Sequence, residues 1–161
     1  MNNILVIDDK DEIRNLIKTV LTDYGFSVQE AGNGKIGMTM MRDQHPDLVI
    51  CDVNMPCMDG YETLSAVRES SATAQIPFIL MTGLVTREGF RRGMGCGADD
   101  YLVKPFTPDE LVESVMSRLA RQTDIQMAAD KRALELHEYA ARYSFPEITG
   151  HCEELLNVVA A

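Results

Sequence analysis

The sequence contains no long apolar run, although 45% of its 161 residues are hydrophobic. No stretch approaches the roughly 18 to 20 consecutive apolar residues that a membrane-spanning helix needs. The first ten residues, MNNILVIDDK, lack the basic region, apolar stretch and cleavage site of a secretory signal peptide. We therefore expect a cytoplasmic protein with no membrane contact, built as one ordinary domain with an appendage.

Cysteine and basic residues are both scarce. The four cysteines show no CxxC spacing and no histidines in the order typical of metal ligands, which favours reduced thiols over disulfides or a zinc site. Fifteen basic residues against 25 acidic ones give a formal net charge of −10. An acidic surface argues against nonspecific nucleic-acid binding, so we expect no direct nucleic-acid partner.

Short apolar runs alternate with helical patterns along most of the sequence. Residues 13–21 carry apolar side chains at offsets typical of one helix face, and Asp59 and Thr107 are capping residues for two later helices. Strands are predicted at 4–8, 27–31, 48–53, 78–82 and 101–104. This alternation predicts a doubly wound α/β fold with a parallel sheet, whose functional crevice lies beyond the carboxyl ends of the strands.

Polar side chains close four of these predicted strands: Asp8 with Asp9, Asp52, Thr82 and Lys104. Three carboxylates at one edge of a sheet repel one another and raise one another's pKa unless a divalent cation lies between them. Oxygen ligands of this kind favour Mg²⁺. The pattern predicts that Asp52 is a nucleophile toward a phosphoryl group, with Lys104 neutralising the group's charge and Thr82 donating a hydrogen bond.

Four stretches together resemble the receiver domain of two-component response regulators of the chemotaxis-regulator type: ILVIDDKDEIR, PDLVICDVNMPCMDGYE, IPFILMTG and GADDYLVKPF. The resemblance covers residues 1–122 and leaves residues 123–161 as a helical C-terminal extension or linker. It implies a flavodoxin-like, five-stranded parallel sheet with the strand order 2-1-3-4-5.

The resemblance also implies the chemistry of the site. Asp52 would accept a phosphoryl group from a histidine kinase or a phosphotransfer protein. Asp9, Asp52 and the main-chain carbonyl of Asn54 would hold Mg²⁺, while Asp8 would help largely through water. Lys104 would bind the phosphoryl group, and its peptide bond to Pro105 is expected to be cis.

Thr82 and Tyr101 would be the switch pair. Phosphorylation adds negative charge and three acceptor oxygens at one spot, so Thr82 can move toward it and leave space for the Tyr101 ring. That repacking would change the face made by the fourth helix, fifth strand and fifth helix, and so control a downstream protein partner or an output domain outside this sequence.

Two other functions stay open from the residues. A phosphate-independent pseudo-receiver is disfavoured because every acid, the threonine and the lysine of the motif are present. A small phosphatase that turns over its own aspartyl phosphate would need a further group to activate water, and none is identified. We therefore predict that the protein is not an enzyme acting on an outside substrate.

The segment predicted as the fourth helix departs from the family pattern through four glycines, at positions 89, 93, 95 and 97. Each glycine inside a helix costs about 0.5–1 kcal/mol relative to alanine. We expect a helix that is short, frayed or mobile and that ends near Gly93 or Gly95. A longer connecting loop is the alternative.

No glycine or proline occurs from Asp109 through Phe145, so the fifth helix is predicted to continue beyond the receiver. One stripe keeps the 3-4 spacing of a coiled coil: Val112, Val115, Leu119, Gln122, Gln126, Ala129, Ala133, Leu136, Ala140 and Tyr143. This spacing favours a homodimer, weakened by the alanines and glutamines, and a helix that folds back on the receiver is the alternative.

The last segment, FPEITGHCEELLNVVAA, resembles the start of the ATPase module of bacterial enhancer-binding activators, which would make the sequence a piece of a longer regulator. It contains no phosphate-binding loop, so ATP hydrolysis by this chain is not expected.

Overall fold

The computed structural model describes residues 2–143, and describes side chains as far as residue 141. Strands and helices alternate along this part of the chain as β1 (Asn3–Ile7), α1 (Asp11–Asp23), β2 (Ser27–Ala31), α2 (Gly34–Gln44), β3 (Leu48–Asp52), α3 (Gly60–Glu69), β4 (Phe78–Thr82), α4 (Arg87–Cys96), β5 (Asp100–Val103) and α5 (Pro108–Tyr143). The strands form one parallel sheet in the order β2-β1-β3-β4-β5, which confirms the predicted flavodoxin-like topology.

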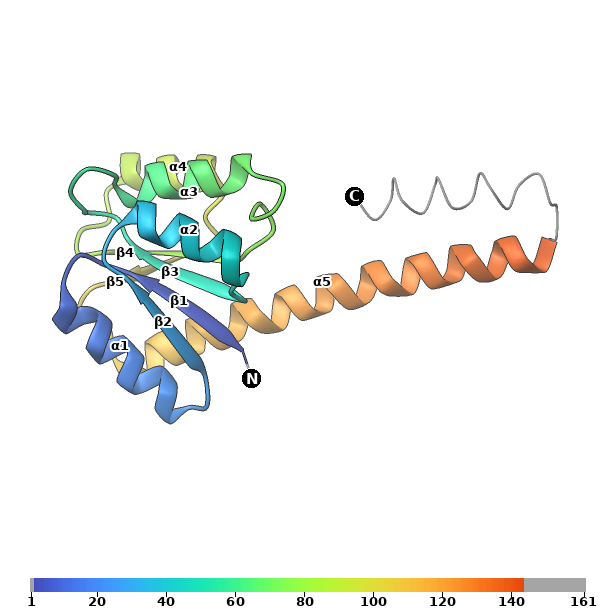
Figure 1. Ribbon diagram of the computed structural model, residues 1–161, viewed down its shortest axis with the longest axis horizontal. Coiled ribbons are helices and arrows are strands. Elements are labelled where there is room, and N and C mark those ends of the chain that lie inside the picture. The colour runs from blue at the N-terminus through green and yellow to red at the C-terminus, as the bar shows by residue number, and fades with distance from the viewer. Residues whose placement is uncertain (1, 144–161) are drawn as a thin grey trace. The chain divides into compact units, whose positions relative to one another are not determined.

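The sheet is covered on both faces, by α1 and the beginning of α5 on one side and by α2, α3 and α4 on the other (Figure 1). Side chains along a strand alternate between the two faces, so each strand contributes to two cores. In β1, Ile4 and Val6 pack with α1 and α5, whereas Leu5 and Ile7 pack toward α2 and α3. Every residue of β3 and β4 is buried, as expected of central strands in a parallel sheet.

The strand ends place the polar residues at one edge of the sheet. Asp52 and Thr82 are the last residues of β3 and β4. β1 and β5 end one residue earlier than predicted, so Asp8 and Lys104 lie just beyond the sheet instead of inside it. The parallel register, in which Thr82 pairs with Val103, brings these ends level.

The helix starts follow the capping residues. The Asp59 side chain accepts a hydrogen bond from the main chain of Glu62, and the Thr107 hydroxyl accepts one from Glu110, as the sequence predicts. The helix predicted from the apolar residues at 13–21 is confirmed as α1. On its apolar face Ile17 and Leu21 are completely buried, whereas Leu16 is 54% exposed.

α4 is a helix of ten residues, so the alternative prediction of a longer connecting loop is wrong. The Thr86 side chain accepts a hydrogen bond from the Gly89 main chain at its start. The helix ends at Cys96, next to the predicted Gly95, and Gly97 follows in the left-handed conformation with φ +96°. A short helix is therefore confirmed, while its mobility stays a prediction.

α5 continues for 36 residues, as predicted from the absence of glycine and proline. Among the helices between residues 2 and 143, none has the length and hydrophobicity to cross a bilayer. The chain divides into two compact units, residues 1–119 and 120–161. The receiver boundary at residue 122 stays a prediction, and the segment that resembles the ATPase module lies outside the described residues.

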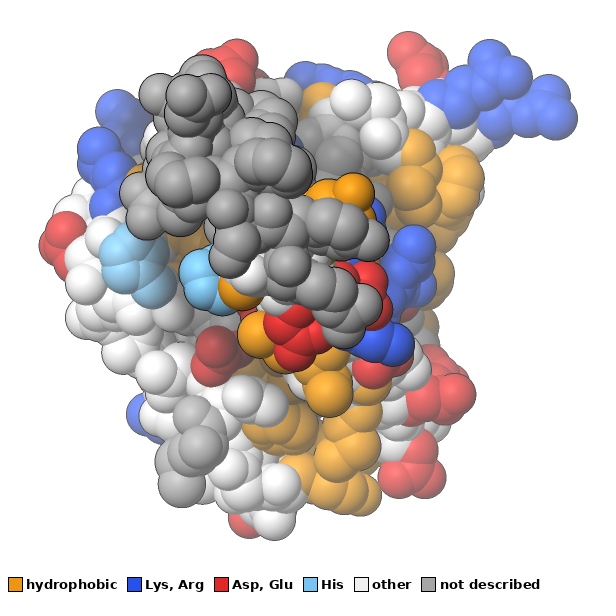
Figure 2. All heavy atoms as spheres, turned by 90° about the vertical axis from the view of Figure 1, so that its right-hand side faces the viewer, with side chains coloured by type: hydrophobic (Ala, Val, Ile, Leu, Met, Phe, Trp, Pro, Cys, Tyr) orange, Lys and Arg blue, Asp and Glu red, His pale blue; other side chains and the backbone are white. Residues whose placement is uncertain are grey.

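Charged side chains of both signs are interspersed on the face of the molecule shown in Figure 2. The three cysteines within the described residues, Cys51, Cys57 and Cys96, are free. Burial, followed by the charge of Asp52, raises the pKa of the Cys51 thiol well above its usual value, so this thiol stays protonated.

Candidate functional site

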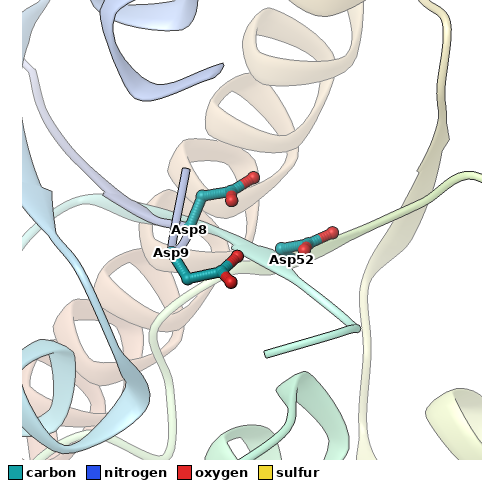
Figure 3. A group of neighbouring side chains, drawn as sticks. All are labelled: Asp8, Asp9 and Asp52. Carbon is teal, nitrogen blue, oxygen red and sulfur yellow. The ribbon is translucent and has the colours of Figure 1, made fainter. Parts of the chain in front are cut away.

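Three carboxylates meet at the carboxyl edge of the sheet. Asp8 and Asp9 follow β1, Asp52 ends β3, and their side chains lie side by side (Figure 3). One oxygen from each lies within 4.8 Å of the others. Asp8 and Asp52 are buried, whereas Asp9 is exposed to solvent. This set of hard oxygen donors, partly open to solvent, fits a divalent cation that keeps some of its water.

Lys104, the residue after β5, also contacts this cluster. Its Nζ lies 3.0 Å from an Asp52 oxygen and 3.3 Å from an Asp8 oxygen. The Lys104–Pro105 peptide is cis, as expected from the family resemblance. The lysine therefore reaches the acidic cluster directly, but one ammonium faces three carboxylates and leaves the cluster with excess negative charge.

The electrostatics of the cluster follow from burial and charge. Burial raises the pKa of Asp52; the hydrogen bond from Lys104 opposes this, and the charges of Asp8 and Asp9 add to it. Burial alone would lower the pKa of Lys104, but its bond with Asp52 and the charges of Asp52 and Asp8 outweigh burial and raise it. The lysine side chain therefore stays protonated. The remaining excess of negative charge favours the binding of a second cation in the cluster.

The backbone beside Asp52 is held by Gly60. A Cβ atom at Gly60 would lie 2.5 Å from the Asp52 carbonyl oxygen and 2.9 Å from the Val53 Cα. The Gly60 N–H also donates to the Val53 carbonyl at 2.9 Å. Only glycine permits this approach, so the start of α3 packs directly against the segment that carries Asp52.

Thr82 lines an open groove of about 310 Å³, together with Asn54 and Leu84. Its hydroxyl donates to the Leu84 carbonyl at 2.9 Å and accepts from the Leu84 N–H at 3.2 Å. Thr82 is buried, whereas Asn54 and Leu84 are exposed. The hydroxyl is therefore held by the loop after β4.

Tyr101 is directed toward α4. Its hydroxyl donates to the Gly89 carbonyl at 2.8 Å, and its ring stacks on Phe90 with 5.3 Å between the ring centroids. Burial, followed by the nearby Tyr61 hydroxyl, raises the pKa of Tyr101. The structure thus brings the three acids and Lys104 together, while Thr82 and Tyr101 hold separate hydrogen-bond partners.

Sequence reasoning missed Arg14, which supports the acidic cluster from α1. Its guanidinium donates to the Asp8 main-chain carbonyl and to the Asp11 side chain, and its Nε lies 3.6 Å from a Glu30 oxygen. The spacing of Asp11 and Arg14 is a common helix ion pair, so the sequence contains no signal that distinguishes this arginine from a surface residue.

The fold and the site together define a flavodoxin-like α/β domain with an acidic, lysine-bearing site at the carboxyl edge of its sheet. The family model described as the response regulator receiver domain matches residues 4–116. The chain belongs to this family.

Relatives and solved structures agree with that assignment. The regulatory protein AtoC of Escherichia coli is 38% identical over 123 residues, which cover 76% of this chain and 26% of AtoC. The probable transcriptional regulator ycf27 of Porphyra purpurea is 40% identical over 122 residues, which cover 76% of this chain and 49% of ycf27. The chemotaxis protein CheY4 of Vibrio cholerae is 33% identical with a TM-score of 0.71, and the match covers 73% of this chain and 98% of CheY4.

The match covers only part of the curated relatives, a quarter of AtoC and about half of ycf27. The comparisons therefore identify the receiver domain.

Proposed function

We propose that this chain is a phosphoacceptor receiver, in which Asp52 takes a phosphoryl group from the phosphohistidine of a histidine kinase or phosphotransfer protein. The observation that carries the proposal is the position of Lys104, whose ammonium contacts both Asp52 and Asp8 within the acidic cluster. A buried carboxylate with an adjacent fixed cation is a suitable acceptor for a group that brings more negative charge.

The chemistry follows from these contacts. An Asp52 oxygen attacks the phosphorus, the bond from phosphorus to the histidine nitrogen breaks, and its electron pair returns to the imidazole. Lys104, which now binds Asp52, is placed to pair with a phosphoryl oxygen instead. Thr82 can donate to another phosphoryl oxygen once its hydroxyl leaves Leu84.

Magnesium is the cofactor that this donor set fits. Asp9, Asp52 and the Asn54 main-chain carbonyl would hold Mg²⁺, with Asp8 acting largely through water. When bound, the ion would neutralise negative charge on the phosphoryl oxygens. Its presence would also relieve the repulsion among the three carboxylates.

The output surface would be the α4–β5–α5 face, with Thr82 and Tyr101 as the switch pair. Several apolar side chains on these elements are exposed, including Phe90, Val103 and Met116. Exposed apolar side chains suit a protein partner or an output domain outside this sequence, and we expect neither a membrane nor nucleic acid to bind this chain directly. We propose a cytoplasmic location for this signalling role.

Acetyl phosphate with Mg²⁺ tests the acceptor directly, by intact mass. We expect a stable mass increase of one phosphoryl group that is lost in Asp52→Asn and retained in Asp43→Asn, a control acid exposed on α2. An unmodified wild-type protein would favour the pseudo-receiver, and repeated turnover of phosphate esters would favour the phosphatase.

We also propose that α5 mediates a weak homodimer beyond residue 119. Val112 and Val115, which begin the predicted stripe, are buried in the receiver core and cannot pair with a second chain. Further along, Leu136 of the stripe is exposed, and so are Ile125 and Tyr139, which lie outside the stripe but on the same side of the helix at offsets of 11 and 3 from Leu136. A partner would therefore contact the second half of the stripe together with these neighbouring side chains.

Sedimentation of the full chain against residues 1–122 tests this dimer. We expect association for the full chain and a monomer for the shorter one. In the full chain, Leu136→Asp should dissociate the dimer, whereas Leu134→Asp, on the opposite side of the helix, should leave it intact. Monomers throughout would exclude the dimer.

A further inference from the structure

Asp8 has a hydrogen-bond partner on each of its polar groups. Its main-chain N–H donates to the Ala31 carbonyl at 3.2 Å, and its carboxylate accepts from the Lys10 N–H at 2.9 Å and from the Lys104 ammonium at 3.3 Å. The remaining group is its main-chain carbonyl, which accepts from the Arg14 guanidinium. The side chain and the main chain of this buried acid are therefore held from four directions.

The contact with Arg14 also bears on Asp9. The Asp8 carbonyl and the Asp9 N–H belong to one planar peptide group, so Arg14 fixes the orientation of the main chain that leads into Asp9. Asp9 is exposed, whereas Asp8 and Asp52 are buried, so packing constrains Asp9 least among the three acids. The position of its carboxylate therefore depends on the main chain that carries it.

Arg14 is itself held by two acids. Its guanidinium donates to the Asp11 side chain, and its Nε lies 3.6 Å from a Glu30 oxygen. Only 15% of the Arg14 side chain is exposed, and the Nε atom is buried. The planar fork thus joins the loop after β1, the first turn of α1 and the strand β2, and a planar fork of this kind suits precise positioning.

Charge and geometry make opposite predictions for Arg14. A guanidinium repels a metal ion, so its charge alone would weaken the binding of Mg²⁺. Asp11 and Glu30 offset this charge, since both carboxylates pair with the arginine. Removing Arg14 would leave these two acids without that partner, which by charge alone would tighten the binding of Mg²⁺. Weaker binding after its removal would therefore report the position of the ligands.

We propose that Arg14 is a positioning residue for the metal site, which holds the Asp8–Asp9 peptide group so that the Asp9 carboxylate can share one Mg²⁺ with Asp52. This inference rests on the proposed phosphoacceptor function, because it concerns the Mg²⁺ site of that function. The effect passes through the Asp8 carbonyl. It should therefore change the affinity for Mg²⁺ and not the transfer of the phosphoryl group to Asp52.

Titration of the full chain with Mg²⁺, followed by amide signals in nuclear magnetic resonance spectra, tests this role without any turnover. We expect Arg14→Met to raise the Kd for Mg²⁺ by about tenfold, as for other residues that orient metal ligands. Arg14→Lys should stay at least about threefold weaker than the wild type, since an ammonium keeps the charge but lacks the fork. Lys18→Met is the matched control, because Lys18 pairs with the same Glu30, and it should change the Kd by less than about twofold.

Phosphorylation by acetyl phosphate separates metal binding from chemistry. In Arg14→Met, the Mg²⁺ concentration that gives half of the maximal rate should rise with the Kd. The rate at saturating Mg²⁺ should stay within about twofold of the wild-type rate. A residue that only stabilised the fold would show the reverse, a lower maximal rate at an unchanged half-maximal concentration, and that result would overturn the proposal.

The unaltered protein gives an independent test if a variant does not fold. With ¹⁵N-labelled arginine, the Arg14 guanidinium should give separate Nη signals, because its bonds to Asp8 and Asp11 hinder rotation of the group. The exposed Arg42 should give one averaged signal. One averaged signal for Arg14 would overturn the proposal.

The two proposals fail in different ways. If the wild type shows no binding of Mg²⁺, the metal site of the proposed function fails, and the role of Arg14 fails with it. If the wild type binds Mg²⁺ and Arg14→Met binds it equally or more tightly, only the role of Arg14 is overturned. Full recovery of the affinity in Arg14→Lys would likewise overturn that role alone.

Discussion

The Lys104 ammonium lies between Asp52 and Asp8, at 3.0 Å and 3.3 Å from one oxygen of each. These residues follow or end β5, β3 and β1, and the lysine and Asp8 are 96 positions apart in the sequence. The contact therefore joins strands that are not neighbours in the sheet, and it places one cation against two buried acids. We therefore expect the stability of this edge to depend on that cation.

Removing the cation should destabilise the protein and make it depend on Mg²⁺. In buffer without divalent ions, we expect Lys104→Met to lower the free energy of unfolding by about 2–3 kcal/mol, because it leaves buried carboxylates unpaired. Mg²⁺ at a hundred times its Kd should restore about 2.7 kcal/mol. Urea denaturation measures both effects, and Lys35→Met, at an exposed position of α2, is the control. Equal stability of the two variants would contradict this role of Lys104.

Tyr101 should make the protein less stable at high pH. Its pKa is raised by burial, so above about pH 10 the folded protein retains a proton that the unfolded chain has lost. The free energy of unfolding should therefore fall as pH rises through that range. In Tyr101→Phe this decrease should be smaller, although the variant loses about 0.5–1.5 kcal/mol at pH 7 with the bond to Gly89. Parallel pH curves for the two proteins would contradict the burial of this hydroxyl.

Arg68 should be worth more to stability than a surface arginine. Its guanidinium donates to the main-chain carbonyls of Ala74, Ile76 and Gly97 and pairs with Asp99. We expect Arg68→Ala to cost about 2–3 kcal/mol, because three carbonyls lose a charged donor.

Two variants sharpen this test by chemical denaturation. Arg68→Lys should recover only a minor part of the loss, since one ammonium cannot reproduce the fork of the guanidinium. Arg91→Ala, at an exposed position of α4, should change stability by less than about 0.5 kcal/mol. Full recovery with lysine would show that charge alone matters at position 68.

Cys57 should be a site where glycine stabilises the protein. It follows Pro56 in the loop after β3 and has φ +70°, and the Met58 N–H donates across it to the Pro56 carbonyl at 2.8 Å. Residues other than glycine adopt this conformation at a cost of about 1–2 kcal/mol. Cys57→Gly should raise the free energy of unfolding by about 0.5–1 kcal/mol after the entropy of the unfolded chain is included.

The opposite substitution provides the contrast at this position. Cys57→Val should lower the melting temperature, because a β-branched side chain fits the left-handed region least well. If Cys57→Gly were destabilising, the thiol itself would have to make a contact that outweighs the backbone strain.

Much of the site was predictable because its residues follow strands or cap helices. Apolar runs and caps act over a few residues, so the sequence determined the strands, the start of α3 at Asp59 and the continuation of α5. Parallel strands then bring their carboxyl ends together, which is why Asp8, Asp52 and Lys104 could be placed at one edge.

The tertiary structure alone decided which side chains meet across elements. The sequence did not show that Leu16 is exposed, that Arg14 supports Asp8, or that Gly93 faces the ring of Tyr101. These relationships depend on how closely packed helices approach a sheet, and such distances arise from many contacts remote in sequence. Local patterns therefore determined the elements and their ends, whereas packing determined the surroundings of each functional side chain.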